Sequence, residues 1–165
     1  MKPALLVVDV QEKFFHLNPT MTQSLNDALQ YINAAIELFR EKDLPIISVQ
    51  HVHEEEKLMP GEEEFELPEA LNVLPSDLHI HKRYGNSFNK TPLAEKLRDL
   101  DVDTVIITGF CAEHCVLSTY RGAQDLDFTP IILRNSLASD NLENIKFVEN
   151  VSDLISYGAL RKVLG

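Results

Sequence analysis

The stretch from Thr104 to Ser118 combines a buried strand, a turn and a cysteine where reactive cysteines are common. It begins as a continuous apolar and β-branched run, which is typical of a strand buried on both faces, and it breaks at Gly109. From Ala112 the pattern becomes helical, so we expect Cys115 in the first turn of a helix. The free N–H groups and positive dipole end of a helix lower the pKa of a thiol and stabilise an oxyanion. The stretch therefore predicts a cysteine nucleophile with stabilising groups beside it.

An acid and an amine are expected near this cysteine. Asp9 follows an apolar run that starts at Ala4, and Lys82 lies near the end of an alternating run. The carboxyl ends of parallel strands face one ligand crevice, so both side chains should reach the sheet edge that carries Cys115. An acid that accepts the thiol proton and a cation that holds the charged forms suffice for nucleophilic catalysis. Taken alone, Asp9 could equally cap the turn that follows it.

Strand and helix patterns alternate along the whole chain. Strands are predicted at residues 4–10, 45–52, 77–83, 104–108, 129–134 and 154–156. A long helix is predicted from a start marked by residues 19–22 to a stop at residues 43–45, with its apolar stripe over 25–39, and further helices are predicted at 91–100, 112–125, 143–148 and 160–164. The segment 135–140 is expected to be a loop. This alternation predicts an α/β fold, a three-layer α/β/α sandwich around a mostly parallel six-stranded sheet.

Composition limits the organisation and the partners. The chain has 165 residues, of which 44% are hydrophobic, and this suits a single domain covering residues 1–165. Its net charge of −11 opposes binding to nucleic acid or to anionic membrane surfaces, so we expect a small-molecule or protein partner. The apolar runs are too short to span a membrane, and Asp9 comes too early for a signal peptide. A cytoplasmic location with both cysteines as free thiols follows as the expectation.

Two further segments admit more than one interpretation. His51 and His53 could bind a metal, but no third ligand is evident near them, and a pocket-wall or surface role is favoured. The segment 54–69 is rich in glutamate and is expected to be a solvated loop with at most a turn of helix. Its position after a strand end also allows it to act as a lid.

Three motifs together resemble the isochorismatase-like cysteine hydrolases, a superfamily that includes nicotinamidases, N-carbamoylsarcosine and ureidoacrylate amidohydrolases, and isochorismatase itself. They are Asp9-Val-Gln11, Lys82 ahead of Tyr84-Gly-Asn-Ser-Phe88, and Gly109-Phe-Cys-Ala-Glu-His-Cys-Val116. The likeness runs over nearly the whole chain in order and spacing. It implies that Cys115 is the nucleophile, that Asp9 is the general base and acid, and that Lys82 is the orienting cation.

The resemblance also implies a non-proline cis peptide between Phe110 and Cys111, and an oxyanion hole formed by the backbone N–H groups of Cys111 and Cys115. It implies a Rossmann-like sheet and a homo-oligomer, a dimer or larger. Isochorismatases proper lack the thiol, so Cys115 favours cleavage of a C–N bond, in an amide or carbamoyl-type substrate, through a thioester acyl-enzyme. No cofactor is expected. Nicotinamidases carry a metal site with Asp-x-His after the second strand, whereas this chain has His51-Val-His53 there, and no metal ligands are predicted.

The substrate pocket is predicted from position alone. Its expected members are Gln11, Phe14, His51, Asn86, Phe88 and Glu113. Cys111 and His114 could form a catalytic pair or a metal site with Cys115, but zinc needs a fourth ligand and His114 should point away from Cys115 on a helix. Cys111 is therefore interpreted as a residue of the oxyanion loop. The alternative function is a non-catalytic or redox-responsive member of the same fold that binds a ligand.

Overall fold

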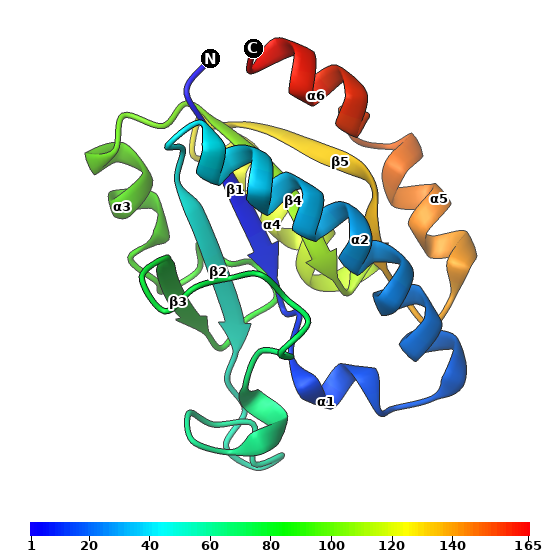
Figure 1. Cartoon of the computed structure of the whole chain (residues 1–165). Helices are drawn as coiled ribbons and strands as arrows, with labels where there is room; N and C mark the ends of the chain where they lie inside the picture. The colour runs from blue at the N-terminus through cyan, green and yellow to red at the C-terminus, as the bar shows by residue number, and fades with distance from the viewer.

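The computed structural model describes residues 1–165 and contains the expected alternation of strands and helices (Figure 1). The strands are β1 (Pro3–Val8), β2 (Ile46–His51), β3 (Leu78–Lys82), β4 (Thr104–Phe110), β5 (Thr129–Ala138) and β6 (Leu154–Ile155). The α-helices are α1 (Glu12–Phe15), α2 (Pro19–Glu41), α3 (Leu93–Asp99), α4 (Leu117–Asp125), α5 (Leu142–Asn150) and α6 (Tyr157–Val163). A 3-10 helix, η1 (Glu63–Phe65), and a π-helix, η2 (Ala112–Val116), complete the set.

All six strands form one parallel sheet in the order β3-β2-β1-β4-β5-β6. Helices cover both faces, and the predicted three-layer α/β/α sandwich is confirmed. The strand arrowheads in Figure 1 point towards the end of the molecule that holds α1 and the segment after β2. Because the strands are parallel, every strand delivers its C-terminal residue to this edge.

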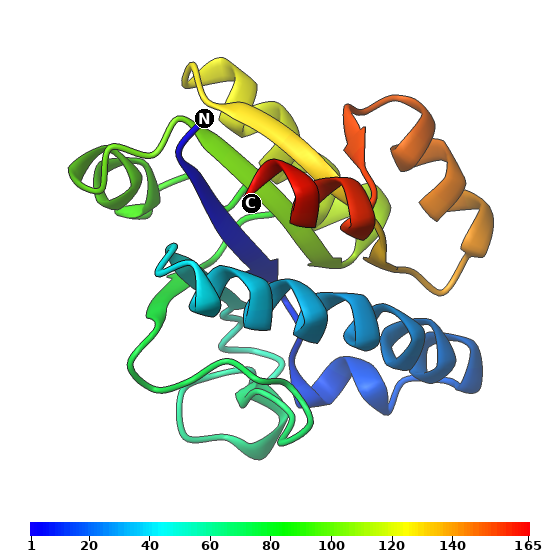
Figure 2. The same ribbon diagram turned by 45° about the horizontal axis from the view of Figure 1, so that its top comes forward.

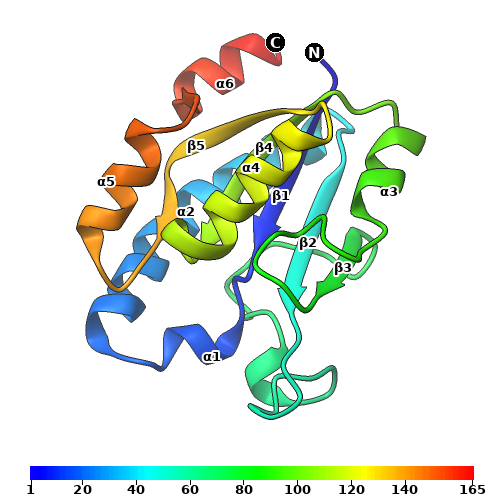
Figure 3. The same ribbon diagram turned by 180° about the vertical axis from the view of Figure 1, so that it is seen from behind.

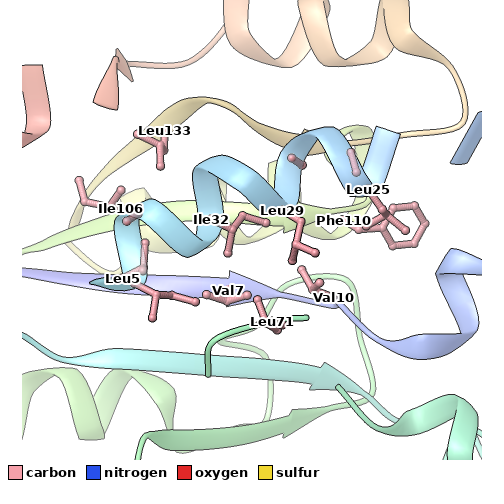
Figure 4. Close-up of a cluster of buried hydrophobic side chains, with 14 of the residues drawn as sticks. Leu5, Val7, Val10, Leu25, Leu29, Ile32, Leu71, Ile106, Phe110 and Leu133 are labelled. Carbon is pink, nitrogen blue, oxygen red and sulfur yellow. The ribbon is translucent and has the colours of Figure 1, made fainter. Parts of the chain in front are cut away.

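The long helix α2 covers one face of the sheet. Asn18 caps it by accepting a hydrogen bond from the N–H of Met21 at 2.8 Å, and a proline occupies its first position. Its apolar stripe, which includes Leu25, Leu29 and Ile32, packs on the side chains that β1 and β4 present on that face (Figure 4). Figure 2 shows α6 on the same face, and its Leu160 belongs to the same core. This packing fixes the first turns of α2 near the C-terminal sheet edge.

The opposite face is covered by α3, α4 and α5 (Figure 3). Leu93 and Leu97 of α3, Tyr120 of α4 and Val148 of α5 are buried in this second core. The sheet therefore has apolar contacts on both faces, as the continuous apolar runs of its central strands predict. None of the helices combines the length and the apolar character needed to cross a membrane.

One local prediction is wrong. β5 continues to Ala138, although residues 135–140 were expected to be a loop, because a register shift against β4 lets the strand resume after Asn135, whose φ is 67°. Such a bulge interrupts the alternation by which a strand is recognised.

The helix predicted over residues 112–125 is present, and Cys115 lies in its first turn as expected. That first turn is the π-helix η2, and the α-helix starts at Leu117. The short helix α1 was not anticipated.

Candidate active site

The ends of β1 and β4 meet at the C-terminal edge because a glycine lets them approach. Val8 pairs with Gly109, and a Cβ at position 109 would lie 2.1 Å from the carbonyl oxygen of Val8. Gly109 also has a φ of 118°, which L side chains rarely adopt. Asp9 follows with a φ of 53°, while its N–H still donates to the carbonyl of Val49 on β2 at 2.8 Å. The chain thus turns away from the sheet with the Asp9 side chain at its edge.

Asp9 and Lys82 form a buried ion pair. Lys82 Nζ lies 2.9 Å from Oδ2 of Asp9, and the exposed fractions of the two side chains are 0% and 2%. The same Nζ lies 3.0 Å from Nδ1 of His51, at the end of β2. A carboxylate oxygen of Asp9, a ring nitrogen of His51 and Sγ of Cys115 all lie within 4.8 Å of one another. The structure therefore brings together the three predicted catalytic residues and adds His51 to them.

The thiol of Cys115 is protonated at neutral pH. Burial, followed by the negative charge of Asp9, raises its pKa to about 12, while Lys82 acts in the opposite direction. The expectation that the start of the helix lowers this pKa is therefore wrong. Burial and the neighbouring carboxylate decide the direction of the shift. A buried neutral thiol beside a carboxylate needs that carboxylate to accept its proton when it reacts.

His51 is neutral. Burial and then the ammonium of Lys82 lower its pKa below the ordinary value. A neutral imidazole that accepts from Lys82 at Nδ1 carries its own proton on Nε2. Lys82 is thereby held between two acceptors, the carboxylate of Asp9 and the ring of His51.

The histidine pair does not fit a metal site of the kind that its position in the family suggests. No cluster of three potential ligands contains both His51 and His53, and their ring centroids are 6.5 Å apart. The cluster that does contain His51 also has the ammonium of Lys82 next to it, which repels a cation. His51 contacts the buried ion pair instead, and His53 lines the cavity beside it.

The turn after β4 has the predicted backbone geometry. The peptide bond between Phe110 and Cys111 is cis. The carbonyl of Cys111 accepts hydrogen bonds from the N–H groups of His114 and Val116, each at 3.1 Å, and these bonds hold the π-helical turn. The N–H of Cys111 itself donates to no other group of the chain. Burial and the nearby carboxylate of Glu113 raise the pKa of the Cys111 thiol, so this second cysteine is also neutral.

A cavity of about 390 Å³ opens above Cys115 and Asp9. One part of its wall is apolar and comes from Phe14, Leu17, Met21, Leu58 and Phe110. The other part is polar and comes from His51, His53, Glu56, Glu113, His114 and Asp140. Its size suits a small molecule. Of the predicted pocket residues, the cavity includes Phe14, His51 and Glu113.

Three predicted pocket residues do not line the cavity, and that part of the prediction is corrected. Gln11 is fully buried and links two segments: its amide donates to the carbonyls of His51 and Phe65, and its Oε1 accepts from the N–H of His51. Asn86 caps its own turn by accepting from the N–H of Phe88. Phe88 is buried in the core on the α3 side of the sheet. These residues were assigned to the pocket from their positions in the motifs, but their side chains are directed into the protein.

Other lining residues were missed because tertiary packing brings them in. Leu17 and Met21 reach the cavity only because α2 starts beside it, and no local pattern marks them. His114 was expected to point away from Cys115, yet it lines the same cavity, since the π-helix changes the angular spacing of the side chains. The glutamate-rich segment is a loop with the single turn η1, as expected, and it contributes Glu56 and Leu58 to the wall.

The chain is similar to known proteins over most of its length. The family model described as the Isochorismatase domain matches residues 3–150. The isochorismatase family protein YrdC of Bacillus subtilis is 31% identical over 140 residues, which are 84% of this chain and 74% of that protein. A ureidoacrylate amidohydrolase of Methylorubrum extorquens is 30% identical over 111 residues, 62% of this chain and 45% of the relative.

Among solved structures, the N-carbamoylsarcosine amidase of Thermoplasma acidophilum superposes with a TM-score of 0.82 at 25% identity, covering 94% of this chain and 95% of that one. The resemblance seen in the three motifs is thus confirmed over most of the chain. Since the family model covers all the elements that carry Asp9, Lys82 and Cys115, the chain belongs to the isochorismatase family and is a hydrolase of that family.

Proposed function

We propose that this protein is a cysteine amidohydrolase that cleaves a C–N bond of a small amide or carbamoyl-type molecule through a thioester acyl-enzyme. The observation that carries the proposal is the cluster of Asp9, His51 and Cys115 within 4.8 Å, with Lys82 paired to Asp9, at a cavity that a small molecule fits. Two relatives whose names specify amide chemistry, the amidohydrolase and the amidase above, support it.

In the first half of the reaction, Asp9 accepts the thiol proton as Sγ of Cys115 attacks the carbonyl carbon. Because the thiol is neutral at rest, proton removal and attack are linked, and the carboxylate must be ionised beforehand. Lys82 pairs with this carboxylate and fixes its position. The C–N bond then breaks, the proton on Asp9 goes to the departing nitrogen, and the acyl group remains on sulfur as a thioester.

In the second half, water attacks the thioester while Asp9 accepts a proton from that water. The acid leaves and the thiol is restored, so that one amide and one water give one acid and one amine. The negative oxygen formed in each half needs donors, and we assign this role to the N–H groups of Cys111 and Cys115. The N–H of Cys111 is free to donate. One such donor contributes about 3 kcal/mol to a transition state.

We also propose a cytoplasmic location and a homo-oligomeric state for the protein. Two cysteines without a disulfide suit a reducing compartment, which supports a cytoplasmic location. The family resemblance supports a homo-oligomer. Sedimentation of the purified chain tests the oligomer, and a monomer at micromolar concentration would remove it.

The test of the proposed function uses release of ammonia or amine from a panel of small primary amides and carbamoyl compounds. Cys115→Ala should lower turnover by about a thousandfold or more. Cys111→Ala is the matched control, because it removes a thiol from the same cavity and leaves the backbone N–H in place. We expect it to keep turnover within about tenfold of the wild type.

The alternative is a non-catalytic or redox-responsive member of the same fold that binds a ligand. It predicts no turnover of any amide, together with ready oxidation or alkylation of Cys115. The pKa of about 12 argues against the redox-responsive role, since a redox-sensing cysteine is ordinarily acidic and exposed.

A further inference from the structure

The charges around the cavity are unevenly neutralised. Four carboxylates line it, those of Asp9, Glu56, Glu113 and Asp140. Asp9 is paired with Lys82 at 2.9 Å, and Glu56 is paired with Lys13 at 2.5 Å. Glu113 and Asp140 form no ion pair, and no lysine or arginine side chain lines the cavity. The wall therefore carries negative charge that the protein leaves uncompensated.

Glu113 lines the cavity with one of its oxygens held by a hydrogen bond and the other without a partner. Its Oε1 accepts a hydrogen bond from Oγ of Ser139 at 3.0 Å, which fixes the carboxylate. Its Oε2 is buried and has no hydrogen-bond partner in the chain. A buried polar atom without a partner is costly, and such atoms are concentrated where a ligand completes the contact. Burial opposes ionisation of Glu113, but hydrogen bonding to its carboxylate, including the bond from Ser139, lowers its pKa below the ordinary value.

A second unpartnered oxygen lies in the same cavity. Oδ1 of Asp9 is buried and accepts no hydrogen bond, and Asp9 as a whole is only 1% exposed. The carboxylate of Glu113 lies within 4.8 Å of a ring nitrogen of His114 and of Sγ of Cys111, and Glu113 belongs to the same π-helical turn as Cys115. The cavity wall thus holds two carboxylates that each have an unpartnered oxygen, no lysine or arginine lines it, and the nearby ammonium of Lys82 is already paired with Asp9.

We propose that this site selects amides that carry no negative charge and that present a protonated amine or an N–H group to Glu113. The inference rests on the proposed function, since it names which amides the same site accepts. Glu113 is then a specificity-determining residue, with Asp140 adding charge at the exposed rim. The apolar wall around Phe14 and Phe110, whose rings lie 4.5 Å apart, takes the uncharged body of the molecule.

The charge preference is measured at Cys115 without any turnover. Two methanethiosulfonates of similar size are used, one with a trimethylammonium group and one with a sulfonate. In each reaction the sulfur of the cysteine forms a disulfide and methanesulfinate leaves. The full chain is treated at about pH 8, where histidines are ordinarily neutral. The rates at Cys115 are taken from fragment masses, which separate it from Cys111, and each rate is divided by that of glutathione.

The wild type should react at least about tenfold faster with the cationic reagent, the effect of one uncompensated charge at close range. Glu113→Gln keeps the acceptor for Ser139 and removes only the charge, so it should lower this preference by about threefold or more. Asp140 is exposed and tolerates substitution, so Asp140→Asn should lower the preference by less than Glu113→Gln does. Glu69→Gln, exposed and away from the cavity, makes the same change in net charge and should leave the preference unchanged. An equal or faster reaction with the sulfonate, or a Glu113→Gln variant with the full preference, would overturn the inference.

A turnover comparison separates this inference from the proposed function. Succinamate, butyramide and β-alaninamide have matched chains that end in a carboxylate, a methyl and an ammonium group. We expect kcat/KM to be at least about tenfold higher for β-alaninamide than for succinamate. The reverse order, with hydrolysis lost in Cys115→Ala, would overturn the charge selection and leave the proposed function standing. Hydrolysis that survives Cys115→Ala would overturn the proposed function, whatever the order.

Discussion

Lys82 and Asp9 form an ion pair across the strand that separates them in the sheet. Lys82 ends β3 and Asp9 follows β1, so β2 lies between them, and the two side chains meet with Nζ 2.9 Å from Oδ2 beyond its end. His51, the last residue of β2, accepts from the same ammonium. Three neighbouring strands therefore supply Lys82, His51 and Asp9 to one cluster, and Cys115 comes from the turn after the fourth strand, β4.

The effects of Asp9 and Lys82 on the free energy of unfolding should be strongly coupled. Asp9→Asn or Lys82→Met alone leaves an unpaired buried charge and should lower the free energy of unfolding by about 3–5 kcal/mol. The double variant removes both charges and should recover at least half of that loss. Urea unfolding measures all three. Losses that simply add in the double variant would contradict the coupling.

The control for this cycle is a pair on the surface. Lys146 and Glu143 lie 2.9 Å apart, with exposed fractions of 70% and 76%. Removing either charge there should change the free energy of unfolding by less than about 1 kcal/mol, since solvent screens an exposed pair.

The thiol of Cys115 should titrate only at high pH. In a Cys111→Ser background, the ultraviolet absorbance of the thiolate should appear as pH approaches the pKa of about 12. Asp9→Asn removes a negative charge and should lower this pKa, whereas Lys82→Met removes a positive charge and should raise it. The folded state favours the protonated thiol, so its stabilising contribution is complete below the ordinary value of 9.0 and is lost as pH rises towards 12. A thiolate already present at neutral pH would contradict this account.

His51 should make the protein less stable in mild acid. Its folded-state pKa is lowered, so the contribution of the neutral ring is complete above the ordinary pKa of 6.5 and is lost as pH falls through the folded value. The loss of unfolding free energy in His51→Leu should therefore be larger at about pH 8 than at about pH 5. Urea unfolding at both values checks this, and an NMR titration locates the pKa. A penalty that is the same at both values would mean that the ring is not held neutral by Lys82.

Gln11 should hold the wall of the cavity in place. Gln11→Leu leaves the N–H and carbonyl of His51 without their partner and should cost about 3 kcal/mol. Gln50→Leu is the matched control, because this second buried glutamine only donates to the carbonyl of Phe65, which Gln11 also reaches. Its cost should be about 1 kcal/mol. Limited proteolysis should cut the segment between β2 and β3 faster in the Gln11 variant alone.

The parts of the site that lie at strand ends could be predicted from the sequence. Asp9, Lys82 and Cys115 each close a recognisable strand or follow one, and the parallel sheet then brings their side chains to one edge. The direction of the Cys115 pKa could not be predicted, because burial and the distance to Asp9 exist only in the folded protein. The sequence showed only the position of Cys115 at the start of a helix, whereas burial and the charge of Asp9 set the direction of its pKa.

The walls of the cavity were predicted least well. Leu17 and Leu58 line it through packing between segments far apart in the chain, and no local pattern marks them. Asn86 and Phe88 stand close to Lys82 in the sequence, yet the turn after β3 directs them into a cap and a core. A short distance along the sequence from a catalytic residue therefore indicated that a segment lies near the site, but not which of its side chains line the cavity.

The most direct test of the central role of Cys115 is the mass of the intact protein, quenched in acid during turnover of an amide that the wild type hydrolyses. We expect a population heavier by the acyl group, that is, by the amide minus its amine, with the added mass on the peptide that contains Cys115. The added mass should be absent from Cys115→Ala and present in Cys111→Ala. Continued hydrolysis by Cys115→Ala, or an acyl group on Cys111 instead, would contradict the account.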